Sequence, residues 1–446
     1  MNRDDIQFPP HHAPLREDIH ALGDIVGAVL REQGGQELYA LAEGDRQLAI
    51  RCRGEGEAGE LRARVGGRDP ALARELVRAF HSFFQLVNVA EKVHRVRRRR
   101  DYFRADSARP QPQGLVDAVL QLKAQGLDLA AVLRLLQVLS IEPVLLAHPT
   151  ESARRTGLRR QQRIADLLLE RSNPLLAPHE QERLLARIRA EVTIDWQTAE
   201  HPRERLTVAD EREHAIFYLG EVLYGVLPVF YEELSRALAQ AYGADAERIE
   251  LPVLLRFRTG VGGDMEGAAD IHAKSIRETL ARQQRAIIGN YLDECRELAQ
   301  RLSQSAGRVG VAPALLRRVG DYRTLLPGAQ SATPARHDPM PYREFMGQLG
   351  ERLRNTFEGR PNGYERPAQF RADVALVAES LRSHGGLHAG YFAVRRLLLR
   401  IDTFGFHLAT LDLRQRAAVH DAVLAQGLAE PAWHGLPPEA RLARLV

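Results

Sequence analysis

The segment of this sequence best suited to proton transfer on an anionic substrate centres on one histidine. His148 precedes Pro149, and Arg154 and Arg155 follow shortly after. Because a residue before proline disfavours helical geometry, His148 is expected to end an extended segment. Neighbouring guanidinium groups disfavour the cationic imidazole, which suits a neutral general base near pH 7. The same arginines would attract a phosphate group.

These residues also have a purely structural interpretation. His148 could be a hydrogen-bonded histidine at the end of a strand. Arg155, Arg159 and Arg163 recur at intervals of four, so they would share one face of a helix, which could simply be solvated. The residue types leave both interpretations open.

Two further polar segments follow short apolar runs. Gly262, Gly263 and Asp264 predict a tight connection between a strand and a helix, whose backbone amides could also cradle an anion. Arg414 follows the run Phe406–Leu413, where its guanidinium could hold a phosphate through two parallel hydrogen bonds. The alternative for Arg414 is a surface salt bridge.

Most of the chain that must position these residues has the pattern of amphipathic helices. Apolar residues recur at spacings of three and four, as in Leu115, Val119 and Leu122. Three short apolar runs interrupt this pattern, at Ile141–Ala147, Leu251–Phe257 and Phe406–Leu413. Each leads into one of the polar segments, as barrel strands do at their carboxyl ends. We therefore expect a mostly α protein with a few parallel strands.

Composition excludes several classes of protein. The 446 residues carry a formal charge of +4 and only two cysteines, Cys52 and Cys295, so a disulfide framework is not expected. There is no signal-peptide pattern, no uninterrupted apolar run of membrane-spanning length and no sequence motif for a metal site. The basic run Arg97–Arg100 is more typical of a solvated helix face or subunit contact than of a nucleic-acid site. A cytoplasmic protein that binds neither membrane nor nucleic acid is predicted.

Three segments together resemble the N-terminal half of phosphoenolpyruvate carboxylases. They are VLLAHPTESARRT (Val144–Thr156), RFRTGVGGDMEGAAD (Arg256–Asp270) and FGFHLATLDLRQ (Phe404–Gln415). The resemblance covers nearly the whole chain. It implies a helical region over residues 1–140, followed over residues 141–446 by the first part of a helix-rich (β/α)8 TIM-type barrel, with about three strands and the C-terminal half of the fold absent.

The resemblance also implies an activity, which joins phosphoenolpyruvate and bicarbonate to give oxaloacetate and phosphate. It assigns His148 as the base that acts on the carboxyl of the transient intermediate, and Arg414 as a ligand of the substrate phosphate. Arg154, Arg155, Gly262, Gly263 and Asp264 match the family at the same site and are expected to help bind substrate. The implied cofactor is Mg²⁺ or Mn²⁺, with ligands in the half that is absent here. The implied partners are further copies in a homotetramer, or a separate C-terminal half.

Several positions depart from the family pattern. Gly260 replaces a tryptophan that walls the apolar side of the substrate pocket, and Glu266 replaces an aspartate. Ala268 and Ala269 replace an asparagine and a proline. Two hypotheses follow: a portion of the enzyme that is incomplete as an isolated chain, or a non-catalytic remnant that binds a phosphorylated metabolite or a partner chain.

Overall fold

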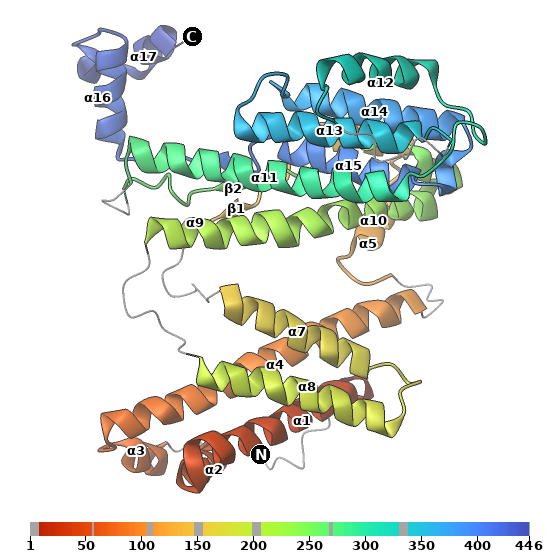
Figure 1. Ribbon diagram of the computed structural model, residues 1–446. Helices are drawn as coiled ribbons and strands as arrows, with labels where there is room; N and C mark the ends of the chain where they lie inside the picture. The colour runs from red at the N-terminus through yellow and green to blue at the C-terminus, as the bar shows by residue number, and fades with distance from the viewer. Residues whose placement is uncertain are drawn as a thin grey trace. The chain divides into compact units, whose positions relative to one another are not determined.

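A computed structural model describes residues 9–55, 58–104, 110–146, 155–198, 207–266, 271–329 and 338–445. The chain divides into two compact units, each with its own interior (Figure 1). Unit 1 comprises Met1–Pro112 and Ala153–Arg205, and unit 2 comprises Gln113–Ser152 and Leu206–Val446. Residues 153–205 are thus grouped with the N-terminal helices. The division at residue 140 that the resemblance implies stays a prediction.

Unit 1 is built from helices in its described part. They are α1 (Ala13–Val29), α2 (Gly35–Glu55), α3 (Gly59–Val65), α4 (Pro70–Arg104), α7 (Arg155–Arg171) and α8 (Pro178–Gln197), with short 3-10 and π turns at Pro10–His12 and Leu30–Gly34. Helix α4 packs on α1 and α7, and α8 packs on the same two helices. Leu22, Val89, Leu168 and Ile188 lie at the centre of the core.

Unit 2 contains the remaining elements. Its helices are α5 (Leu115–Ala124), α6 (Leu129–Val138), α9 (Val208–Phe217), α10 (Tyr224–Tyr242), α11 (Ala273–Arg301), α12 (Pro313–Leu325), α13 (Pro341–Glu358), α14 (Pro367–Ser383), α15 (Tyr391–Phe404), α16 (Ala417–Gly427) and α17 (Pro438–Leu445). Helices α11 and α13 lie side by side, as do α14 and α15 (Figure 1). Tyr291, Phe345, Phe370 and Phe404 are among the largest buried side chains of this core.

Helices α9 and α10 are joined through the π turn Tyr218–Leu223 into one helix, Val208–Tyr242. By length and mean hydropathy it is the one helix in the described residues that could cross a membrane. Leu227, Tyr231 and Leu238 on this helix are nevertheless buried in the core of unit 2. A core helix of a globular domain passes the same test, so this helix is weak evidence for a membrane span.

The three predicted strands form one parallel sheet in the order β1 (Val144–Leu145), β2 (Arg258–Thr259) and β3 (Thr410–Leu411). This confirms a mostly α protein with a few parallel strands. The second apolar run was predicted to be the strand itself. Instead, Leu255 makes only an isolated bridge with Ile141, and β2 begins after Phe257. Strand β2 thus begins where the chain pairs with both neighbouring strands, and not where its residues are most apolar.

The sheet has two unlike faces because alternate residues of a strand point to opposite sides. Val144, Arg258 and Thr410 are in register and share one face, on which Val144 and Thr410 are exposed. On the other face Phe257, Thr259 and Ala409 are buried, and Leu145 and Leu411 are partly buried. The helices therefore cover only one face of the sheet within the described residues of unit 2. Cys52 and Cys295 lie in different units, and both are free and buried.

Candidate active site

The predicted base is not placed by the structure. His148 and Arg154 lie outside the described residues, and Arg155 is described only as the first backbone position of α7. Strand β1 ends at Leu145, and Leu146 is the last residue described before the gap. The geometry of the site therefore rests on the carboxyl ends of β2 and β3.

The glycine-rich segment and Arg414 come together at these strand ends. The Arg414 amide donates to the Gly263 carbonyl at 3.0 Å, and the Met265 amide donates to the Arg414 carbonyl at 3.0 Å. Asp264 and Arg414 form an isolated parallel bridge. Two segments that lie 150 positions apart in the sequence are thus joined through their backbones.

The side chains of Arg414 and Asp264 form a loose ion pair. Nη1 of Arg414 lies 3.4 Å from Oδ2 of Asp264, and the two side chains are 54% and 32% exposed. Exposed pairs of this kind contribute about 0–1 kcal/mol, so little would be lost if the guanidinium turned to a phosphate. The structure thus shows the surface salt bridge that was the alternative interpretation of Arg414, in a form compatible with anion binding.

Both glycines of the turn are required by the backbone. Gly262 has φ +83°, and a Cβ there would lie 2.5 Å from Oγ1 of Thr279 in α11. A Cβ on Gly263 would lie 2.2 Å from the backbone carbonyl oxygen of Asp412, which follows β3. The amides of Val261, Gly263 and Met265 donate to Thr259 Oγ1 or to backbone carbonyls. These three amides therefore hold the turn together in this structure and are not directed at a ligand.

Two glycine-to-alanine changes are expected to act in opposite directions. Gly263→Ala should lower the free energy of unfolding by about 1–3 kcal/mol, because a backbone atom has to move to admit the methyl group. Gly347→Ala, inside α13 with nothing within 4 Å of the new methyl, should raise it by about 0.5–1 kcal/mol through helix propensity. Urea unfolding followed by circular dichroism measures both. Equal changes in the free energy of unfolding for the two variants would show that the Asp412 carbonyl does not restrict residue 263 to glycine.

Sequence reasoning missed a chain of ion pairs that crosses all three strands. Arg258 on β2 donates from Nε to Glu142 at 2.5 Å and from Nη1 to Asp412 at 2.7 Å. Glu142 precedes β1, and Asp412 follows β3 and lies two residues before Arg414. The period-two alternation places Glu142, Arg258, Asp412 and Arg414 on the same exposed face of the sheet. The alternation of residues along the three strands was the signal in the sequence from which these ion pairs could have been predicted.

The hydrogen bond from Arg258 lowers the pKa of the Glu142 carboxyl, and bonding by Ser140 adds to this effect. The hydrogen bonds to Glu142 and Asp412 raise the pKa of Arg258. Because the folded-state pKa of Glu142 is depressed, this contact stabilises the fold above the ordinary pKa of a glutamate. Its contribution is lost as the pH falls through the depressed value.

The described residues do not form a magnesium or manganese site. No group of three or more histidine, cysteine, aspartate or glutamate side chains in the described ranges is placed to hold a metal ion. Glu142, Asp264 and Asp412 each face a guanidinium group rather than one another. This donor set does not fit a divalent cation.

The arginines of α7 serve within unit 1. Arg160 is buried, donates to Asp195 of α8 and makes a second, 3.3 Å hydrogen bond to Thr198 Oγ1. Arg163 makes two hydrogen bonds of 2.8 Å with Glu191, also on α8. These two guanidinium groups tie α7 to α8. The side chain of Arg163 is still 53% exposed, in agreement with a solvated arginine face, whereas Arg160 is buried.

Gly260 occupies a tight position beside β1. A Cβ there would lie 3.0 Å from Cδ2 of Leu146, whose side chain is exposed on the open face of the sheet. Its amide donates to the Leu145 carbonyl at 3.0 Å, so Gly260 continues the pairing of β2 with β1.

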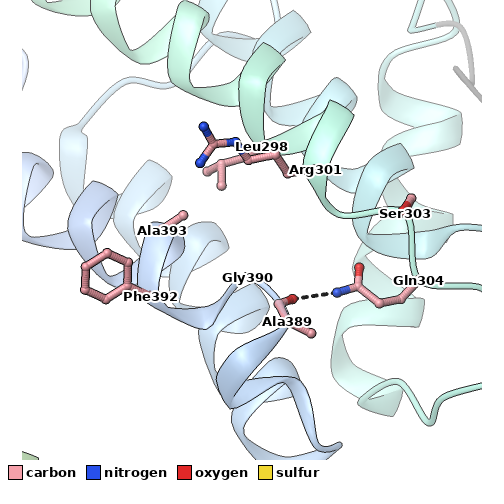
Figure 2. Close-up of a pocket in the computed structure, with 8 residues that line it drawn as sticks. All are labelled: Leu298, Arg301, Ser303, Gln304, Ala389, Gly390, Phe392 and Ala393. Atoms are coloured by element: carbon pink, nitrogen blue, oxygen red, sulfur yellow. Dashed lines mark hydrogen bonds between the residues drawn. The ribbon is translucent and has the colours of Figure 1, made fainter. Parts of the chain in front are cut away.

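A separate hollow of about 460 Å³ lies between the end of α11 and the start of α15 (Figure 2). Gln304 Nε2 donates to the Ala389 carbonyl at 2.6 Å across it. Arg301 also lines it, but its guanidinium pairs with Glu297. None of the predicted site residues lines this hollow, and its lining is mostly apolar, so it offers no arrangement for catalysis.

Comparison with known proteins shows the family to which the chain belongs. The sequence model of the family "Phosphoenolpyruvate carboxylase" matches residues 15–437. The chain belongs to the phosphoenolpyruvate carboxylase family. The phosphoenolpyruvate carboxylase of Xanthomonas campestris pv. campestris strain 8004 is 43% identical over 97% of this chain and 48% of its own length.

Two other carboxylases agree with this assignment. Those of Xanthomonas oryzae pv. oryzae and Ralstonia nicotianae are 42% and 36% identical, over 99% and 93% of this chain and 49% and 43% of their own lengths. The chain thus spans about half the length of the curated phosphoenolpyruvate carboxylases that it matches.

Proposed function

We propose that this chain is the N-terminal portion of a phosphoenolpyruvate carboxylase, which adds bicarbonate to phosphoenolpyruvate to give oxaloacetate and phosphate. The observation that carries the proposal is the convergence of the Gly263 and Arg414 segments at the carboxyl ends of parallel strands. Catalytic residues of strand-and-helix barrels occupy that end of the sheet. This anaplerotic carboxylation is a lyase-type activity of a cytoplasmic enzyme.

His148 is proposed as the base at the same edge. In the sequence it follows Leu145, the last residue of β1, by three positions. In the reaction, the phosphoryl group of phosphoenolpyruvate passes to bicarbonate, giving carboxyphosphate and an enolate. His148 takes the proton from the carboxyl of carboxyphosphate, whose carbon–oxygen bond to the phosphate breaks to give CO2 and phosphate. The enolate carbon then adds to the CO2 carbon and forms the new carbon–carbon bond of oxaloacetate.

Anion binding is assigned to the arginines and the glycine turn. Arg414 holds the substrate phosphate, with Arg154 and Arg155 supplying further positive charge. Gly262, Gly263 and Asp264 fix the position of Arg414 through the backbone contacts described above. Magnesium or manganese supplies charge stabilisation when bound, from ligands outside the described residues.

The exposed face of the sheet supports a barrel proposal. Val144 and Leu146 on this face are about half exposed, and β1 and β3 each have one neighbour in the sheet within the described residues. We propose that the three strands belong to a helix-rich (β/α)8 barrel that further strands complete, and that the complete enzyme is a homotetramer or receives a separate C-terminal half.

Activity is therefore expected only when the remaining half of the enzyme is supplied. The purified 446-residue chain should form no bicarbonate-dependent oxaloacetate from phosphoenolpyruvate and Mg²⁺. A chimaera that joins this chain to the C-terminal half of the Xanthomonas campestris relative should form it, as followed by NADH oxidation with malate dehydrogenase. The unmodified relative is the positive control.

A folded chimaera without turnover would contradict the enzyme proposal and favour the alternative of a non-catalytic remnant. The substitutions at Gly260, Ala268 and Ala269 are the features that favour that alternative. Turnover by the isolated chain would contradict the proposal that the site is shared between the two halves.

A further inference from the structure

Unit 1 contains a cleft that the proposed carboxylase site does not use. It has a volume of about 900 Å³ and lies between η2 (Pro10–His12), α1, α4, α7 and the start of α8. Its size is in the usual range for small-molecule sites, about 300–1,000 Å³. The residues that matter chemically are Asp18, His94, Arg97, Arg100, Arg104 and Arg171.

The floor of the cleft is built by one buried carboxylate. Asp18, whose side chain is 3% exposed, accepts from Arg97 Nη1 at 2.5 Å and from Arg171 Nη1 at 2.8 Å. Arg97 also donates to Ser172 Oγ at 2.7 Å and to the Leu168 carbonyl at 3.2 Å. These contacts hold two guanidinium groups in place before any ligand arrives, as preorganised sites require.

Three buried polar atoms in the lining of this cleft have no hydrogen-bond partner among the described residues. Both ring nitrogens of His94 are buried without a hydrogen bond, and so is Nε of Arg171. His94 as a whole is 8% exposed. Buried polar atoms are nearly always hydrogen-bonded, so such unpaired groups in a cleft call for an explanation, of which a missing ligand is one. Arg171 Nε–H and one ring nitrogen of neutral His94 are donors that call for acceptor atoms, while the other ring nitrogen of His94 is an acceptor.

Two arginines at the mouth of the cleft are placed to meet an anion. Arg100 and Arg104 make no ion pair within the described part of unit 1. The acidic residues Asp101 and Glu170 face Arg98 at 3.6 Å and Arg187 at 3.8 Å, and neither arginine lines the cleft. Asp18 is shared between Arg97 and Arg171, and the lining also holds the carboxylates of Glu17, Asp101 and Glu170.

We propose that this cleft binds a phosphoryl dianion, with His94 and Arg171 as donors at its floor and Arg100 and Arg104 at its mouth. Burial lowers the pKa of His94, and the nearby His12 and Arg97 lower it further. The empty site therefore favours a neutral imidazole, which offers one N–H donor to the ligand. Inorganic phosphate and a phosphomonoester share the required chemistry. The site uses none of the strand-end residues.

Calorimetric titration of the full chain tests this proposal, with inorganic phosphate and glycerol 3-phosphate as probes and acetate at matched ionic strength as the comparison. We expect saturable binding of at least one phosphate probe. His94→Phe, which keeps a ring and removes the nitrogens, should weaken that binding about tenfold or more. Tighter binding of the ester than of phosphate would identify an organic phosphate as the preferred source.

A double variant, Arg100→Gln with Arg104→Gln, keeps the proposal testable if His94→Phe fails to fold. Arg95→Gln is its matched control, since Arg95 is exposed on the same helix and does not line the cleft. The double variant should weaken phosphate binding, and Arg95→Gln should leave it unchanged. Absence of saturable phosphate binding, binding undiminished in folded His94→Phe, or equal losses in the double variant and Arg95→Gln would each overturn the proposal.

Discussion

His148→Asn in the chimaeric carboxylase is expected to reduce oxaloacetate formation by about 10²- to 10⁴-fold, the range that a positioned general base contributes. Asparagine is close in size and remains polar, but it cannot take a proton. Phosphoenolpyruvate should still bind, because the phosphate is held by charge rather than by the imidazole. We therefore expect kcat to fall with little change in substrate affinity.

The measurement combines coupled-assay kinetics with calorimetric titration of phosphoenolpyruvate. His179→Asn is the matched control, since His179 is an exposed histidine on α8 and the substitution is the same. Undiminished oxaloacetate production by His148→Asn would remove this residue from its role. A loss confined to substrate affinity would instead make His148 a binding residue.

Asp373→Ala is expected to cost about 3–5 kcal/mol of folding stability, the penalty for breaking a buried ion pair. Asp373 on α14 has a fully buried side chain that accepts from Arg318 on α12 at 2.5 Å and from Tyr322 at 2.5 Å. Tyr364 donates to the same carboxylate at 2.8 Å, and Arg352 on α13 lies 3.6 Å away with its side chain 13% exposed. Alanine would leave the guanidinium of Arg352 and the phenols of Tyr322 and Tyr364 without the carboxylate that they share.

Burial and the neighbouring carboxylate of Asp373 raise the pKa of both Tyr322 and Tyr364. Both phenols therefore remain protonated donors at neutral pH. Tyr364→Phe removes one hydrogen bond and should cost only about 1 kcal/mol. Glu379→Ala is the matched control, because Glu379 is an exposed acidic residue on the same helix and should change stability by less than about 0.5 kcal/mol.

Urea unfolding followed by circular dichroism gives the three stability changes, and hydrogen exchange of peptides from α12 and α14 locates them. The idea that Asp373 holds these helices together fails if Asp373→Ala costs no more than Glu379→Ala. It also fails if the faster exchange is confined to unit 1.

Helix positions could be predicted because helix periodicity is a local property. Leu115, Val119 and Leu122 recur at helical spacing, and α5 forms there. The boundary of β2 could not be predicted in this way, since Leu251–Phe257 is more apolar than Arg258–Thr259. Strand pairing is a long-range interaction, and it selected the less apolar dipeptide.

The sequence by itself determined the family, three segments that carry the predicted chemistry, and the two glycines that a tight turn needs. Only the tertiary structure brought Arg414 onto the Gly263–Met265 backbone, tied Arg258 to Glu142 and Asp412, and turned Arg160 into the interior of unit 1. Residue type and spacing are encoded locally, whereas a side chain's partner depends on which distant segments pack beside it. The sequence alone therefore does not distinguish an arginine that recognises a ligand from one that pairs with a carboxylate. The surrounding fold makes that distinction.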